Sequence, residues 1–263
     1  MDLRRDAARF YDWSPTVGKD VGFYRSILAA QRGRRLLELG CGTGRVLLSL
    51  LPDCEEATGV DSSEGMLTVL REKLADLDAG ADHVTLVNAD ICSVDLQSRF
   101  DLIIAPGRVF QNLETDTQVD GVFAVIRRHL SPGGSCVLTA YNPNSDRNGI
   151  ISAWSAADPD VETQTREVPY RDGTLRHSHR RIRFTTEPLV LYSELIARYR
   201  EGEREVDCAR FISPMRVYYP DELLQTVTRH GFRVVDKWGG YAGETYGDGP
   251  ELVVRFTAEA TDE

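Results

Sequence analysis

The chain has 263 residues, of which 41% are hydrophobic and 27% are charged, which is an ordinary composition for a globular protein. Its net charge is −10 and its pI is about 5.1, which argues against a nucleic-acid substrate because phosphate binding requires basic surface. No apolar run reaches the ~18 residues of a membrane span. The five cysteines include no C-x-x-C pair, so we expect a cytoplasmic protein without structural zinc or disulfides.

The first predicted element is a helix over residues 21–30, in which apolar side chains repeat at helical spacing. An aromatic cluster that includes Tyr11 precedes it. A phenol can donate a hydrogen bond to a carboxylate, so Tyr11 and Tyr24 either line a ligand site or pack the helix on a sheet. We interpret residues 1–33 as an N-terminal helical lid.

The stretch 36–51 is typical of a buried strand, a glycine turn and a helix, which together make one edge of a nucleotide-binding crevice. The turn carries Gly40, Gly42 and Gly44 at alternate positions. Glycine is needed there because a side chain would block the approach of a ligand or require a disfavoured positive φ. A dinucleotide fingerprint is spaced G-x-G-x-x-G, whereas Arg45 stands here where its last glycine would fall.

The run from Glu38 to Gly44 resembles the first motif of class I methyltransferases, which use S-adenosylmethionine (SAM). The resemblance implies a Rossmann-like, doubly wound sheet of seven strands, six parallel and one antiparallel. It also implies that the loop around Cys41 backs the methionine end of the cofactor. The acidic residue that the family carries two positions before the first glycine corresponds to Glu38.

The second predicted strand, 56–60, ends at Asp61, which lies 21 residues after Gly40. A carboxylate at that distance is placed to accept hydrogen bonds from both ribose hydroxyls of a bound nucleoside. The alternative is that Asp61 caps the helix that begins near Ser62 and includes Met66. We prefer the ribose interpretation because the glycine loop and the spacing agree.

The third predicted strand covers residues 84–87, and Asp90 follows it. The resemblance implies that Asp90 accepts a hydrogen bond from the adenine amino group and that Ile91 packs on the ring. The fourth strand, 100–105, breaks at Pro106. The predicted cofactor-binding set is therefore Tyr11, Glu38, Gly40, Cys41, Gly42, Gly44, Asp61, Ser62, Met66, Ala89, Asp90, Ile91 and Pro106.

The acceptor of the methyl group is expected at the same edge, because ligands of open α/β sheets lie beyond the carboxyl ends of the strands. Arg108 and Gln111 follow the fourth strand, and Tyr141 ends the fifth, 137–141. No residue is an unmistakable general base. The catalytic candidates are Tyr11, Arg108, Gln111, Tyr141, His177, His179 and Tyr246.

From residue 142 to residue 216 the alternation of strands and helices stops, and period-2 patterns predict antiparallel strands over 175–184, 189–199 and 206–212. We interpret this insertion as a cap that selects the acceptor. It holds twelve arginines and twelve carboxylates, and Arg181, Arg183 and Arg198 are the candidates for binding an anionic group of the acceptor. His177 and His179 share one face of a strand. One of them acts as a general base, or the pair is part of an exposed or partly packed face of the cap. Because no third ligand is evident, we predict no metal site.

The remaining residues restore the doubly wound pattern with a helix, a strand over 232–238, a glycine-rich turn and a last strand over 251–256. In the turn, the motif from Tyr241 to Tyr246 resembles small bacterial natural-product methyltransferases, including N-methyltransferases of amino sugars and of peptide α-amines. We therefore divide the chain into a lid (1–33), a SAM-binding core (34–141), a cap (142–216) and a segment that completes the core (217–263).

The resemblance implies a SAM-dependent methyltransferase that acts on an amine, hydroxyl or carboxyl group of a small molecule or short peptide. We favour an amine, because a hydroxyl acceptor needs a base of suitable pKa. The alternatives are an O-methyltransferase of a small hydroxylated metabolite, an NAD-dependent oxidoreductase and a SAM-binding protein without catalysis. Neither a nucleic acid nor a membrane is expected as a partner, and the sequence predicts no particular oligomer.

Overall fold

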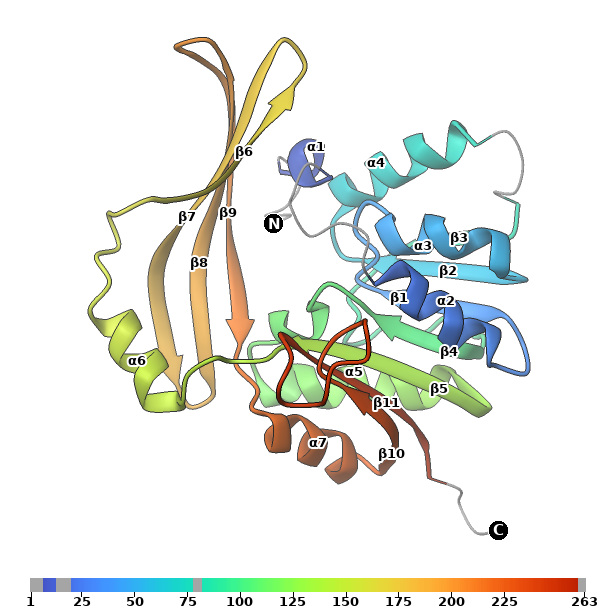
Figure 1. Ribbon diagram of the computed structural model, residues 1–263. Coiled ribbons are helices and arrows are strands. Elements are labelled where there is room, and N and C mark those ends of the chain that lie inside the picture. The colour runs from blue at the N-terminus through green and yellow to red at the C-terminus, as the bar shows by residue number, and fades with distance from the viewer. Residues whose placement is uncertain (1–6, 13–19, 78–81, 260–263) are drawn as a thin grey trace.

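The structure, a computed structural model, describes residues 7–12, 20–77 and 82–259 (Figure 1). Parts of the predicted lid, residues 1–6 and 13–19, lie outside the described residues. The described chain forms a seven-stranded sheet with helices on both faces and a separate four-stranded sheet that stands beside it.

The larger sheet has the strand order β10-β11-β5-β4-β1-β2-β3, and β11 alone runs antiparallel to the other six strands. The predicted arrangement of six parallel strands and one antiparallel strand is confirmed. The strands are β1 (Arg35–Leu39), β2 (Glu56–Asp61), β3 (Val84–Asn88), β4 (Phe100–Ala105), β5 (Leu130–Tyr141), β10 (Phe232–Trp238) and β11 (Glu251–Ala258).

Helices cover both faces of this sheet, so its central strands are apolar at nearly every position. In β4, Ile103 and Ala105 belong to one hydrophobic cluster, and Leu102 and Ile104 belong to the cluster on the opposite face. One face carries α2 (Val21–Ala29), α3 (Arg45–Leu50) and α4 (Glu64–Ala75), and the other carries α5 (Asp116–His129) and α7 (Pro220–Arg229). No helix in the described ranges is long and apolar enough to cross a membrane.

The cap is the four-stranded sheet, with the strand order β6-β7-β8-β9 and antiparallel pairing throughout. Its strands are β6 (Thr163–Tyr170), β7 (Gly173–Thr186), β8 (Leu189–Glu201) and β9 (Arg204–Arg216), and α6 (Arg147–Ser155) packs against its end near Leu191. The three predicted strands are confirmed and are longer than expected. The sequence did not predict β6 or α6.

Three short helices complete the structure: α1 (Ala8–Tyr11), η1 (Leu51–Asp53) and η2 (Val109–Asn112). The α1 helix lies between the cap and α4 (Figure 1). One boundary differs from expectation, since β5 begins at Leu130 rather than at residue 137. The segment 131–134 is therefore part of the strand, and α5 ends at His129.

Candidate cofactor and acceptor site

The three glycines after β1 have different roles, although all have positive φ values, of 71°, 55° and 84°. A Cβ atom on Gly40 would lie 2.6 Å from Val109, and one on Gly44 would lie 2.2 Å from Leu70. These two positions are closed by neighbouring side chains. A Cβ on Gly42 would meet only the Tyr11 ring, at 4.0 Å. Gly42 is therefore the glycine that leaves the backbone open to a ligand.

Asp61 lies against this loop and is only 5% exposed. Its Oδ2 accepts a hydrogen bond from the Gly42 amide at 2.8 Å, and its Oδ1 accepts one from the Ser63 amide at 2.8 Å. The helix α4 is capped by Ser63, whose Oγ accepts from the Met66 amide. Asp61 is thus not the helix cap, and each of its oxygens retains a free lone pair for a ligand hydroxyl.

The residues after β3 lie beside Asp61. The Ala89 amide donates to the Asp61 carbonyl at 3.1 Å, so the ends of β2 and β3 are joined at this edge. Asp90 is exposed, and its Oδ1 accepts from the Cys92 amide at 2.8 Å. Ile91 is half-buried against the core. Asp90 therefore lies exposed at the edge where a nucleoside base is expected.

Glu38 and Arg45 form the buried polar end of the crevice. Glu38 is 2% exposed, and its Oε2 has no hydrogen-bond partner among the described residues. Burial raises its pKa well above the usual range, and the Arg45 guanidinium opposes that shift. Arg45 forms a two-point ion pair with Asp20, with distances of 2.6 and 2.7 Å. Arg45 thus joins α3 to the start of α2.

The ends of β4 and β5 bring two predicted acceptor residues together. Arg108 has a φ of 65°, in the left-handed region that non-glycine residues rarely adopt. Its Nη2 and Nε donate to Glu251 at 2.6 and 3.2 Å, and its guanidinium lies 5.1 Å from the centre of the Tyr141 ring. Glu251 begins β11 and was not predicted as a site residue. Nothing in its local sequence distinguishes it from a surface glutamate.

Gln111 is 1% exposed and uses its whole amide group within the protein. Its Nε2 donates to the Arg216 carbonyl at 2.8 Å, and its Oε1 accepts from the Tyr141 amide at 2.7 Å. Tyr141 is where the chain leaves the core for the cap, and Arg216 is where it returns. Gln111 therefore contacts both points at which the chain passes between the core and the cap. Tyr246 is engaged in a similar way, because its hydroxyl donates to the Pro220 carbonyl at 2.9 Å.

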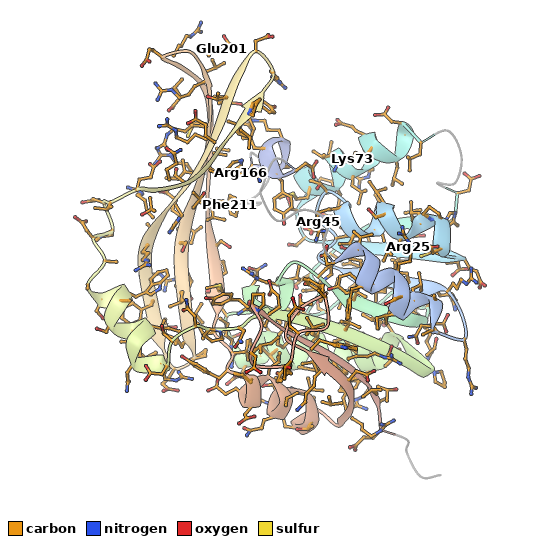
Figure 2. All side chains as sticks on the ribbon, in the orientation of Figure 1. Arg25, Arg45, Lys73, Arg166, Glu201 and Phe211 are labelled. Atoms are coloured by element: carbon orange, nitrogen blue, oxygen red, sulfur yellow. The ribbon has the colours of Figure 1, made fainter. Side chains whose placement is uncertain are left out.

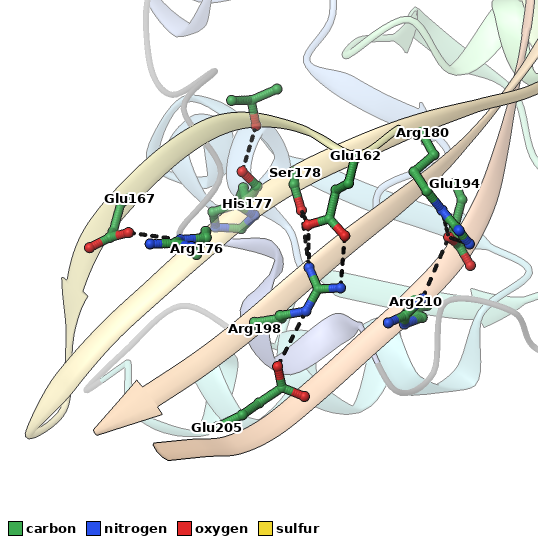
Figure 3. A network of polar contacts seen from close by, with 11 residues as sticks. Glu162, Glu167, Arg176, His177, Ser178, Arg180, Glu194, Arg198, Glu205 and Arg210 are labelled. Carbon is green, nitrogen blue, oxygen red and sulfur yellow. Dashed lines mark hydrogen bonds and ion pairs between the residues drawn. The ribbon is translucent and has the colours of Figure 1, made fainter. Parts of the chain in front are cut away.

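The three cap arginines predicted to bind an acceptor contact groups of the cap itself, and Figure 3 shows the network around Arg198. Arg198 pairs with Glu162 and lies 3.3 Å from Glu205. Arg181 donates to the Ala153 carbonyl and lies over the Trp154 ring. The Arg183 guanidinium lies 3.4 Å from the centre of the Tyr192 ring.

The two histidines of β7 stand opposite apolar residues of β8, with His177 paired to Ala197 and His179 to Leu195. Both are half-buried. They therefore share a strand face, as the sequence pattern predicted. Among the described residues, no group of three or more histidine, cysteine or acidic side chains is arranged to hold a metal ion.

The α1 helix is bound to the cap through Arg9 and Phe10. Arg9 forms a two-point ion pair with Asp207 of β9, at 2.8 and 2.9 Å. Phe10 is 2% exposed, meets the Tyr170 ring edge-on at 5.6 Å, and belongs to a cluster with Tyr199. Burying such a side chain is worth about 1.5–3 kcal/mol.

The residue that follows α1 is bound to the cofactor loop instead. Asp12 accepts from the Thr43 hydroxyl at 2.6 Å and pairs with Lys73 of α4 at 2.7 Å. Lys73 is labelled on α4 in Figure 2. Lys73 also donates to the Thr43 carbonyl. The Asp12 and Lys73 side chains are 35% and 32% exposed, and exposed pairs contribute about 0–1 kcal/mol. The attachment to the loop is thus weaker than the attachment to the cap.

A comparison with known families decides the class. Residues 36–134 match the model of a methyltransferase domain. Over these residues the chain is similar to a methyltransferase domain. The matched segment contains the glycine loop, Asp61 and Asp90, and it ends within β5.

Two curated relatives align with the methyltransferase domain. The chain is 31% identical over 111 residues to a cypemycin N-terminal methyltransferase from Streptomyces sp, covering 42% of this chain and 43% of that protein. It is 29% identical over 119 residues to a dTDP-3-amino-3,4,6-trideoxy-alpha-D-glucopyranose N,N-dimethyltransferase from Streptomyces venezuelae, covering 45% and 47%. These alignments span less than half the length of either relative.

The whole chain, cap included, resembles a solved structure. The CcbJ methyltransferase from Streptomyces caelestis superposes with a TM-score of 0.78 at 25% identity, over 99% of both chains. The glycopeptide N-methyltransferase MtfA superposes with a TM-score of 0.61 at 21% identity, over 95% of this chain and 91% of that chain. The chain thus resembles bacterial natural-product methyltransferases.

The residues of the crevice fit S-adenosylmethionine, the cofactor that the sequence predicts. Glu38 provides a buried oxygen without a partner, which suits the ammonium group of the methionine part. The side of Gly42 is open, which suits close approach to the backbone. Asp61 provides the free lone pairs that suit ribose hydroxyls. A dinucleotide is a poorer fit, because Arg45, paired with Asp20, stands where the third glycine of a dinucleotide fingerprint allows close packing of helix and strand.

Proposed function

We propose that this protein transfers a methyl group from S-adenosylmethionine to an amine of a small molecule or a peptide-like natural product. The observation that carries the proposal is the joint geometry of Gly42 and Asp61 beside the residues at the ends of β4 and β5. Two relatives with printed acceptors, an N-terminal methyltransferase of cypemycin and an amino-sugar N,N-dimethyltransferase, act on nitrogen, whereas a third is a malonyl-[acyl-carrier protein] O-methyltransferase.

The state of the cap arginines supports an acceptor without a diphosphate group. A nucleotide-linked sugar requires guanidinium or ammonium groups that are free to bind its phosphates. Arg181, Arg183 and Arg198 are each engaged within the cap. These three arginines therefore do not offer a diphosphate site, and among the acceptors that the relatives suggest we favour a peptide α-amine or a free amino compound.

When bound, the cofactor supplies a methyl group on an electrophilic sulfonium carbon. The residues of the chain must hold the acceptor nitrogen in line and in its neutral form, with the reacting atoms ~3–3.5 Å apart. Tyr141 provides an aromatic surface at this edge, and Arg108 holds Glu251 beside it. Glu251, with its side chain 15% exposed, is the group that we assign to accept the proton that the nitrogen loses.

The test is product analysis with S-adenosylmethionine and a defined set of acceptors: a short peptide with a free α-amine, an amino sugar, its dTDP-linked form and a phenolic metabolite. We expect S-adenosylhomocysteine to form together with an N-methylated peptide or free amine. Preference for the dTDP-linked sugar would contradict the acceptor class, and an O-methylated product would contradict the amine. If calorimetry detects no binding of S-adenosylhomocysteine, the cofactor assignment fails.

A further inference from the structure

The α1 helix contacts both halves of the molecule, and its two attachments differ in kind. Towards the cap it buries Phe10 among aromatic rings and pairs Arg9 with Asp207. Towards the cofactor loop, the adjoining Asp12 makes polar contacts with Thr43 and Lys73, and the Asp12–Lys73 pair is partly exposed. Since apolar burial outweighs an exposed ion pair, the contacts with the loop break before those with the cap.

We infer that residues 7–12 move as part of the cap, so that movement of the cap away from the core and uncovering of the cofactor crevice are a single motion. The inference rests on the proposed function, because it takes the crevice beside Gly42 to hold the cofactor. Phe10 is a positioning residue in this scheme: it acts on the cofactor through Tyr11, the next residue, whose ring lies beside Gly42.

The arrangement has a direct consequence for turnover. Tyr11 covers the crevice at the only one of the three loop glycines that is open to a ligand. A ligand in the crevice stabilises the position of Tyr11, and through Phe10 it stabilises the part of the cap around Tyr170 and Tyr199. Binding of a ligand in the cofactor crevice therefore favours the position of the cap seen here. By thermodynamic linkage, a ligand that stabilises this position of the cap also strengthens binding in the crevice.

The experiment is hydrogen–deuterium exchange of the full chain, with and without S-adenosylhomocysteine. In the unmodified protein we expect the ligand to slow exchange in the glycine loop and also in the cap hairpins 170–176 and 199–208. In Phe10→Ala we expect the loop to remain protected and the hairpins to lose their ligand-dependent protection. The rate of S-adenosylhomocysteine dissociation, measured by stopped flow, should rise about 10-fold, because the lid is then held only by its polar contacts.

Two variants with matched ion pairs provide the control. Arg9→Gln removes a pair with side chains 39% and 40% exposed, and Arg176→Gln removes a pair within the cap with both side chains 38% exposed. We expect Arg9→Gln to weaken the protection of the hairpins by the ligand and Arg176→Gln to leave it unchanged. Phe10→Leu, which keeps an apolar side chain in the cluster, should retain the coupling if Phe10→Ala proves unstable.

A third variant tests which attachment is the stronger one. In Lys73→Gln, residues 7–12 should stay on the cap, so their rate of hydrogen–deuterium exchange should change less than 3-fold. In Phe10→Ala the same rate should change more than 10-fold. The inference is overturned if the ligand protects the loop but never the hairpins, or if Phe10→Ala keeps the protection of the hairpins. Absence of any S-adenosylhomocysteine binding would instead overturn the proposed function.

Discussion

The Asp61 carboxylate accepts a hydrogen bond of 2.8 Å from the Gly42 amide, so the end of β2 holds the loop that follows β1. We propose that the same carboxylate also binds the ribose hydroxyls of the cofactor, which would give it a second role. Asp61→Ala removes the ligand contacts and releases the loop at once. Because hydrogen bonds to a charged group are worth about 1.5–3 kcal/mol, we expect the affinity for S-adenosylhomocysteine to fall by about 100-fold. Isothermal titration calorimetry measures it, and Asp76→Ala, at the exposed end of α4, should bind normally.

The collision at Gly44 predicts a difference between two glycines of similar conformation. Gly44 and Gly133 have φ values of 84° and 80°, but a Cβ on Gly44 would lie 2.2 Å from Leu70, whereas one on Gly133 meets nothing within 4 Å. A left-handed alanine costs about 1–2 kcal/mol, and overpacking adds about 1–3 kcal/mol. In urea denaturation, Gly44→Ala should lower the free energy of unfolding by more than Gly133→Ala does. Equal losses of unfolding free energy in Gly44→Ala and Gly133→Ala would show that the Leu70 side chain moves aside without cost.

Gln111 should matter more for the junction of cap and core than for the acceptor. Gln111→Ala leaves the Tyr141 amide and the Arg216 carbonyl without their partner in a buried position. Each such group costs about 1–3 kcal/mol, so we expect the free energy of unfolding to fall by about 2–4 kcal/mol. Gln225→Ala, on the exposed side of α7, should change it by less than about 0.5 kcal/mol. Full stability of Gln111→Ala would contradict the junction role.

The Arg108–Glu251 pair predicts a defect in transfer rather than in cofactor binding. In Glu251→Gln the Arg108 guanidinium loses its charged partner and the acceptor edge loses its carboxylate. We expect the rate of methyl transfer to fall by about 10²-fold or more, in the range of a lost proton-transfer group, while the affinity for S-adenosylhomocysteine stays within about 2-fold. Steady-state kinetics and calorimetry on the same preparations check both values. A loss of affinity that matches the loss of rate would place Glu251 in the cofactor crevice instead.

The Arg9–Asp207 pair predicts how acid affects stability. The hydrogen bond from Arg9 is the main cause that holds the pKa of Asp207 below its usual range. A lowered pKa in the folded state stabilises the fold above the unfolded value of about 3.9, and this contribution is lost as the pH falls through the folded pKa. Asp207→Asn should therefore cost less than about 1 kcal/mol at pH 7, because the pair is exposed, and the difference should shrink below about pH 4. Urea denaturation at several pH values measures it. A difference that grows with acidity would have the wrong sign.

The core was predictable because each of its strands ends in a feature that the sequence itself marks. The three glycines mark the end of β1, Asp61 ends β2, and Pro106 follows β4. In contrast, β6 has hardly any buried positions and α6 has none. An edge strand and a helix without a buried face leave no hydrophobic period to detect. Both elements were therefore missed.

The polar contacts of the site were beyond prediction for a different reason. Arg108 and Glu251 are 143 positions apart, and Thr43 and Asp12 are 31 apart. Nothing local in either member of these pairs points to the other. For the same reason, a glutamine in the segment after β4 is compatible both with a ligand contact and with the junction that Gln111 forms. Only the folded arrangement distinguishes the two.

The junction that Gln111 forms also bears on how such enzymes diversify. The excursion of the chain begins and ends at two backbone groups that share one side chain. We therefore expect that a foreign segment replacing residues 142–215 must keep these two end points and also the contacts of the cap with α1, such as that of Asp207 with Arg9. If the cap selects the acceptor, as we propose, a recombinant that keeps both Gln111 and these contacts would combine a new acceptor range with the same cofactor half.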